Sequence, residues 1–170
     1  WSYLALYRIL PDWGTGRFRQ ACETATEPFS AGWVVGACLL MRREVYEQIG
    51  GLDPGFFLFA EETDFCERAW QAGWEVKYLP AASVMHSESH VASRYTLIRV
   101  RSGHLSSLYY FRKREQHLRV VALKLVFTVE LLAKIALRTV QRLRARREDE
   151  EALRTRLHAD WTVLGDVWRY

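Results

Sequence analysis

Glycine and proline punctuate the chain closely between residues 33 and 80, and this spacing limits every element there to a short length. The apolar run Trp33–Met41 is rich in β-forming side chains and predicts a short buried strand. A helix is predicted at Arg43–Ile49, because the Gly50-Gly51 pair that follows suits a left-handed helix end. Asp53-Pro54-Gly55 is typical of a turn. This part of the chain therefore favours short strands between helices.

The same alternation continues to about residue 114. The elements predicted there are a helix at Glu61–Ala72 ended by Gly73, strands at Trp74–Leu79 and Ala82–Met85, and a helix at Ser93–Arg114 that breaks near Gly103. Residues Pro11–Ser30 lack periodicity and are predicted to form a loop. The expected fold class is α/β.

The C-terminal part is different in character, since Leu118–Val140 is apolar almost all the way round a helix. Its length approaches that of a membrane span, but each internal charge would cost roughly 2.5–3.5 kcal/mol at the bilayer centre. Two alternatives remain open: an interfacial helix with Arg138–Arg147 against anionic lipid, or a helix packed on protein. A second short helix is expected after the acidic patch Glu148–Glu151.

Charge and cysteine content narrow the classes of protein. The net charge is +4, and the basic excess lies at Arg112–Arg114 and from Arg138 to Arg147, which indicates an acidic partner for the C-terminal part. A nucleic-acid binder is disfavoured, because no recognisable motif accompanies the short basic run. The three cysteines form no CxxC pair, so neither a disulfide framework nor a zinc knuckle is indicated, and reduced thiols in a cytosolic setting are expected.

Three carboxylates open the predicted helix at residue 61. Glu61, Glu62 and Asp64 follow the aromatic run Phe56–Phe59, and Asp64 is four residues before Arg68. Acidic side chains in a first helical turn have an ordinary role, because they complement the helix dipole and cap free N–H groups. A chemical role is the alternative. A carboxylate beside an aromatic wall can act as the general base that deprotonates a sugar hydroxyl.

A longer ordered pattern joins these features. It runs Gly-Ala, a small apolar run, Arg-Arg, a helix, Gly-Gly-hydrophobic-Asp, a Phe-rich stretch, Glu-Asp-x-Asp-hydrophobic-Cys-x-Arg, an aromatic strand, a Pro and a His. The residues that carry it are Gly36-Ala37, Arg42-Arg43, Gly50–Asp53, Phe56–Phe59, Glu61–Arg68, Trp74, Pro80 and His86. The pattern resembles the second half of the catalytic domain of family 2 glycosyltransferases, closest to the rhamnosyltransferase-like branch. The clear likeness covers Trp33–His86.

The resemblance implies a partial GT-A domain, a Rossmann-like α/β sandwich, with a helical C-terminal extension. The division expected is 1–115 for the acceptor-side part of the domain and 116–170 for the extension. In the family the base is the second acid of the Glu-Asp pair, which is Glu62 here. This chain has Glu where Asp is usual, so Glu61 remains an alternative or shares the role. Asp64 would be the supporting acid, with Arg68 as its partner.

Further site residues follow from the same resemblance. Trp33, Gly36 and Ala37 would lie near the acceptor and the donor sugar, and Phe59 and Arg68 would help to bind substrate. Core packing is the alternative for Trp33. His86 matches a position that often helps to bind a divalent metal, Mg or Mn. Its alternative is a strand-end histidine bonded to backbone.

The resemblance also implies partners and limits. A nucleotide-sugar donor and a glycan or lipid-linked acceptor are expected, with no nucleic acid. No Asp-x-Asp motif occurs in the chain, and the first residue is Trp1 rather than Met. The donor site and most metal ligands are therefore expected on a missing N-terminal half, and this fragment alone is expected to be inactive. The expected location is cytoplasmic, peripheral at the inner face of the cell membrane. A non-catalytic membrane-associated scaffold module is the alternative function.

Overall fold

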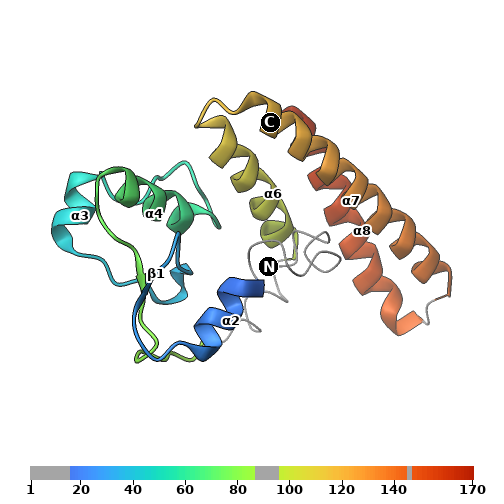
Figure 1. Cartoon of the computed structure of the whole chain (residues 1–170). Coiled ribbons are helices and arrows are strands. Elements are labelled where there is room, and N and C mark those ends of the chain that lie inside the picture. Colours follow the sequence, from blue (N-terminus) through green and yellow to red (C-terminus); the bar gives the residue numbers. More distant parts are fainter. Residues whose placement is uncertain (1–15, 87–95, 145–146) are drawn as a thin grey trace. The chain divides into compact units, whose positions relative to one another are not determined.

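The structure is a computed structural model, and it describes residues 16–86, 96–144 and 147–170. The chain divides into two compact units (Figure 1). The first, here called the N-terminal unit, comprises residues 1–55 and 60–87. The second, here called the helical unit, comprises residues 56–59 and 88–170. Each unit has a hydrophobic core of its own.

The N-terminal unit contains short elements joined by turns. In chain order they are α2 (Gly16–Thr24), β1 (Phe29–Ser30), the 3-10 helix η1 (Gly36–Cys38), α3 (Arg43–Gln48), α4 (Glu61–Gln71) and β2 (Lys77–Tyr78). Strands β1 and β2 pair antiparallel, with Phe29 opposite Tyr78. The two rings of this pair lie 5.2 Å apart between centroids. A cross-strand aromatic pair of this kind stabilises a two-stranded sheet.

Helix α4 supplies most of the core of this unit. Phe65 and Ala69 lie one turn apart on its buried face, together with Cys66, and they pack with Val45 of α3 and with Val76. Gly73 ends the helix with φ 84°, and Trp74 N–H then donates to Ala69 C=O at 2.9 Å. The predicted helices at residues 43–49 and 61–72 are confirmed to within one residue.

Several predicted strands and one predicted loop are wrong. The run Trp33–Met41 holds the 3-10 helix η1 in otherwise extended chain and forms no strand, and Leu40 is 96% exposed. A strand requires a neighbour for its backbone groups, and β1 ends its ladder before this run. Residues 82–85 are exposed and irregular, and pairing within 74–79 is confined to β2. The predicted loop 11–30 contains α2 and β1 in its described part.

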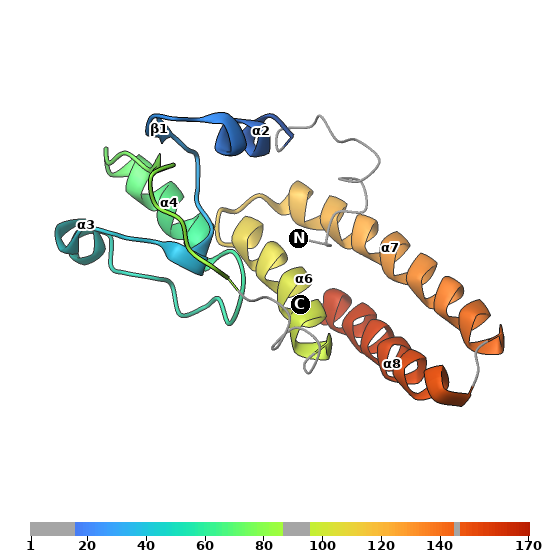
Figure 2. The same cartoon turned by 90° about the horizontal axis from the view of Figure 1, so that it is seen from below.

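Within residues 96–144 and 147–170, the helical unit is an assembly of α6 (Thr96–Arg112), α7 (His117–Arg144) and α8 (Arg147–Arg169). Helices α7 and α8 lie side by side in both views (Figures 1 and 2). The core residues come from all three helices: Leu108, Phe127, Leu131, Val163 and Val167. The predicted break near Gly103 is wrong, because α6 is continuous and Gly103 is buried within it. The last helix has 23 residues and is not short.

The aromatic run Phe56–Phe59 belongs to the helical unit. The Phe56 ring meets Tyr109 of α6 edge-on at 4.8 Å, and Ser106 Oγ donates to Leu58 C=O at 2.8 Å. Helix α6 packs with α7 and α8, so the compact units divide near residue 87 and not near 115. The division of a family domain at 115 from an extension stays a prediction.

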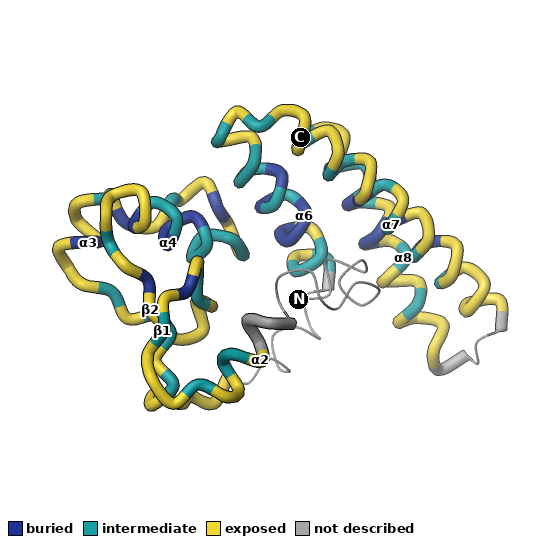
Figure 3. The backbone as a smooth tube through the Cα atoms, in the orientation of Figure 1, coloured by how far each residue is buried: buried dark blue, intermediate teal, exposed yellow. Residues whose placement is uncertain are grey.

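The described residues are mainly helical, with one two-stranded sheet. This agrees with an α/β class only in a coarse sense, since the described residues hold no larger parallel sheet of the Rossmann kind. Figure 3 shows that burial follows the inward faces of α4 and α6. None of the helices that the structure describes combines the length and the apolar character needed to cross a membrane.

Candidate active site

The carboxylates of α4 follow an unusual piece of backbone. Phe59 and Ala60, directly before the helix, both have left-handed conformations, with φ of 71° and 68°. Neither is glycine, and each such residue costs roughly 1–2 kcal/mol of strain. Backbone strain of this kind clusters at functional sites. It places Glu61 and Glu62 in the first turn of α4, where the helix dipole favours negative charge.

Glu62 lies against the 3-10 helix η1. A Cβ added to Gly36 would stand 3.6 Å from Glu62 Cβ and 3.7 Å from Glu62 Cδ, which is ordinary van der Waals distance, so the Glu62 side chain lies close to the open side of Gly36. Oε2 of Glu62 is buried and accepts no hydrogen bond from any described residue. Oε2 of Glu61 is likewise buried and accepts no hydrogen bond from any described residue. Buried polar atoms normally have partners, so two orphaned carboxylate oxygens on adjacent residues mark a site for an external donor.

The electrostatics of this turn support that assignment. Burial raises the pKa of the Glu61 carboxyl above its usual value, a bond to its own backbone opposes the rise, and the negative charge of Glu62 adds to it. Burial also raises the pKa of the Cys66 thiol, where a backbone bond at Val34 opposes and Glu62 again adds. The charge of Glu62 therefore acts on both neighbours, and a proton arriving here meets a strongly negative environment.

Asp64 is set apart from the other two acids. It is fully buried, and its Oδ2 accepts a hydrogen bond from Arg68 Nε at 2.8 Å. The other guanidinium nitrogens donate to Ile49 C=O and Gly51 C=O, each at 2.6 Å. This ion pair ties α4 to the end of α3 and to the turn that follows. Asp64 thus has the supporting partner expected for it, while substrate binding by Arg68 stays a prediction.

The remaining predicted substrate residues lie at different depths. Trp33 is partly buried and packs against the core of the N-terminal unit, as the packing alternative predicts. Gly36 and Ala37 are exposed in η1, and Gly36 lies close to Glu62. Phe59 is half-buried and belongs to the helical unit. Substrate contact by these residues stays a prediction.

The predicted metal ligand His86 is exposed in irregular chain. Within residues 16–86, 96–144 and 147–170, no three His, Cys, Asp or Glu side chains come together as a metal site would require. The described residues therefore do not by themselves fit a divalent metal, and no step through a metal is derived from them. A role for His86 at a metal stays a prediction.

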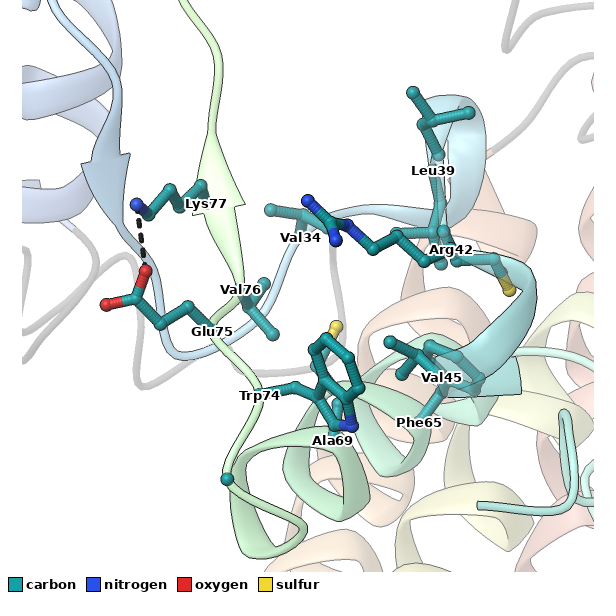
Figure 4. A pocket seen from close by; sticks show the side chains of 14 residues that line it. Val34, Leu39, Arg42, Val45, Phe65, Ala69, Trp74, Glu75, Val76 and Lys77 are labelled. Carbon is teal, nitrogen blue, oxygen red and sulfur yellow. Dashed lines mark ion pairs between the residues drawn. The ribbon is translucent and has the colours of Figure 1, made fainter. Parts of the chain in front are cut away.

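A cavity of about 690 Å³ that sequence reasoning missed lies along the later part of α4 (Figure 4). Its walls come from the segment 34–42, from α4 and from residues 73–77. Cys66, four residues after Glu62, lines the cavity, and Arg42, Glu75 and Lys77 give it a polar edge. Glu75 and Lys77 form an ion pair at 2.8 Å. The available signals in the sequence were Arg42, Cys66 and Trp74, which belong to the ordered pattern and also line the cavity.

Comparison with known proteins places this geometry in a family. Residues 19–102, which include η1, α4 and the three carboxylates, match the family model described as glycosyltransferase like family 2. Residues 19–102 are similar to glycosyltransferase family 2. The match confirms the expected family and the expected class of enzyme domain, a glycosyltransferase. It also implies the GT-A-like α/β fold of which the described sheet would be a small part.

Curated glycosyltransferases show the same relationship. N-acetylglucosaminyl-diphospho-decaprenol L-rhamnosyltransferase of Mycobacterium tuberculosis is 32% identical over 102 residues, which are 60% of this chain and 33% of that protein. Rhamnosyltransferase WbbL of Escherichia coli is 29% identical over 84 residues, 49% of this chain and 31% of that protein. The chain thus spans about a third of the length of these relatives. No solved structure matches it significantly.

Proposed function

We propose that this chain forms the acceptor-side part of an inverting glycosyltransferase, with Glu62 as the general base. The observation that carries the proposal is the buried, unpartnered Oε2 of Glu62 against the backbone of Gly36. A carboxylate oxygen that no protein group satisfies is free to accept a hydrogen bond from an acceptor hydroxyl. Glycine at position 36 leaves the hydroxyl a close approach along the backbone.

Glu62 is preferred to Glu61 for an electrostatic reason. A general base must be ionised before it can take a proton. Burial and the charge of Glu62 raise the pKa of Glu61, which favours the protonated form of that carboxyl. Glu61, with its own unpartnered oxygen, is assigned to orienting the acceptor hydroxyl.

The proposed reaction is a single displacement. Glu62 removes the proton from an acceptor hydroxyl while the hydroxyl oxygen attacks the anomeric carbon of the donor sugar. The bond from that carbon to the nucleotide diphosphate breaks, its electron pair leaves with the diphosphate, and the configuration inverts. The Asp64–Arg68 ion pair holds α4 in place and so positions the base. General base catalysis of this kind contributes about 10²–10⁴-fold to rate.

The substrates are proposed from the relatives. The name of the mycobacterial relative couples rhamnosyl transfer to a diphospho-decaprenol acceptor. A nucleotide-sugar donor and a glycan or lipid-linked acceptor are therefore proposed for this protein, in a cytoplasmic location at the inner membrane face. A divalent metal, as is general in the family, would need ligands beyond the described residues. Sugar transfer by the 170-residue chain alone would contradict that arrangement.

Transfer assays on the full-length protein test the base. We expect Glu62→Gln to lower kcat at least 100-fold with little change in folding, because glutamine keeps the shape and cannot take the proton. Glu47→Gln is the matched control, since Glu47 is an exposed carboxylate of the same unit paired with Arg43, and we expect wild-type kcat from it. Thermal melting of both variants checks the fold. Wild-type kcat from Glu62→Gln would remove Glu62 as the base.

A further inference from the structure

Helix α7 is apolar on two opposite faces. Phe127, Leu131 and Ile135 face the core of the helical unit and are at most 7% exposed. A second row of large apolar side chains lies on the outer face, where the row is exposed by 45–87%: Leu118, Leu125, Val129, Leu132, Val140 and Leu143. An exposed apolar surface of this length needs an explanation. Figure 3 shows the exposed residues following one side of α7.

The outer row forms one continuous strip. At 100° per residue its six members fall within an arc of about 80°, and Val126 and Leu137 widen that arc to about 140°. Between residues 120 and 143 no charged residue falls within the arc. Such a strip is wider than the seam of a two-stranded coiled coil and matches the apolar face of a helix that lies in a membrane interface.

Tryptophan and basic side chains border the strip along one flank. Trp168 of α8 is 53% exposed, its indole N–H donates to Thr128 of α7 at 3.0 Å, and Lys124 lies 5.7 Å from its ring. Trp161 of α8 is 57% exposed and lines a hollow with Arg142 of α7. Exposed tryptophan beside lysine and arginine is the composition found where a protein meets lipid headgroups.

Charge separates the helical unit from the rest of the chain. Residues 88–170 contain 17 Lys and Arg against 9 Asp and Glu, a net charge of +8, whereas the remaining residues contain 7 against 11, a net charge of −4. The two values sum to the +4 of the whole chain. A unit with this charge attracts an anionic surface. Two copies meeting through α7 would instead bring two units of +8 together, which repel.

We propose that the outer face of α7 docks on an anionic lipid surface. The strip enters the headgroup and acyl boundary, Trp161 and Trp168 lie at the headgroup level, and the basic residues of the flank contact the lipid charges. The helical unit would then hold a glycosyltransferase domain at the surface where a lipid-linked acceptor resides. The docking itself does not depend on the transfer reaction.

Vesicle flotation with the full-length protein tests the proposal. We expect the protein to float with vesicles of phosphatidylcholine and phosphatidylglycerol (7:3), to remain behind with phosphatidylcholine alone, and to be released as salt increases from about 0.1 to 0.5 M. We expect Val129→Glu to weaken binding at least tenfold. Val84→Glu is the matched control, since Val84 is 56% exposed in the N-terminal unit and Val129 is 69% exposed, and it should leave binding unchanged.

Three further measurements distinguish lipid docking from misfolding, from loss of transfer activity and from dimerisation. Leu125→Gln, which adds no charge, should also weaken binding, and unchanged thermal melting of both α7 variants shows that the fold is kept. Glu62→Gln should float as the wild type does, which separates docking from transfer. Failure to float with anionic vesicles, or equal losses in Val129→Glu and Val84→Glu, overturns the proposal. Sedimentation velocity tests for a second copy of the chain on this face. A wild-type dimer that becomes monomeric in Val129→Glu, together with no binding to vesicles, overturns the lipid proposal in favour of dimerisation through α7.

Discussion

Arg68 and Asp64 form the buried ion pair that joins α4 to the end of α3. Arg68 Nε donates to Asp64 Oδ2 at 2.8 Å, and the exposed fractions of the two side chains are 20% and 0%. The same guanidinium reaches two backbone carbonyls, those of Ile49 and Gly51, which lie 19 and 17 residues away. The carboxylates at the start of α4 depend on this ion pair for their position relative to the rest of the N-terminal unit.

Replacing Arg68 by lysine tests that role. Lysine keeps the charge but cannot direct three donors at once, so we expect Arg68→Lys to lower the free energy of unfolding by about 2–3 kcal/mol. Urea denaturation measures the change. Arg43→Lys is the control, because the Arg43–Glu47 contact at 3.8 Å is exposed by 87% and 65% and contributes less than about 1 kcal/mol. Equal effects of the two changes would contradict a structural role for Arg68.

Glu61 predicts a pH dependence of stability. Burial and the charge of Glu62 raise the pKa of Glu61 in the folded chain, so the folded state binds this proton more tightly than the unfolded state. The contribution of Glu61 to the free energy of unfolding is therefore lost as pH rises from the ordinary pKa of 4.5 through the raised pKa. Because glutamine does not titrate, we expect Glu61→Gln to be more stable than wild type at pH 7, with the difference shrinking towards pH 4. Urea denaturation at several pH values measures the difference in free energy of unfolding between Glu61→Gln and wild type. A difference that stays constant with pH would contradict the prediction.

Glu130 predicts the opposite dependence in the helical unit. Burial alone would raise its pKa, but the His104 ring, whose Nε2 lies 3.8 Å from Glu130 Oε2, and the Lys134 ammonium outweigh burial and lower it. A lowered pKa gives stability that is present above the ordinary value of 4.5 and is lost as pH falls through the folded pKa. We expect Glu130→Gln to cost about 1–3 kcal/mol at pH 7, because it weakens a charged contact to buried His104, and less at acidic pH.

Circular dichroism at 222 nm during urea denaturation measures the Glu130 effect. Glu150→Gln is the matched control, since the Arg142–Glu150 ion pair at 3.0 Å joins α7 and α8 of the same unit but is exposed by 42% and 51%. We expect this control to change stability by less than about 1 kcal/mol. A loss for Glu130→Gln that grows as pH falls would show that the sign of the dependence is wrong.

Local signals were sufficient for α3 and α4 of the N-terminal unit, but not for α2, which lies in a segment predicted to be a loop. The glycines at 50, 51 and 73 adopt positive φ and end α3 and α4 close to where the sequence predicts. They were not sufficient for strands, because a strand exists only where another strand pairs with it. The run Trp33–Met41 has β-forming side chains but forms no strand ladder among the described residues, whereas Phe29–Ser30 pairs with β2. Gly103 likewise signals a break in isolation, yet it is buried inside a continuous helix.

The family likeness, the ends of α3 and α4, and the three carboxylates in one helical turn could be predicted from the amino-acid sequence alone. The helix ends and the turn of carboxylates depend on residues a few positions apart, whose mutual placement is set by helix geometry. The folded chain was needed to show that Asp64 pairs with Arg68 while Glu61 and Glu62 keep unpartnered oxygens, and that one apolar face of α7 is buried and the other is exposed. These differences depend on backbone and helices that arrive from distant parts of the chain, so no local pattern encodes them.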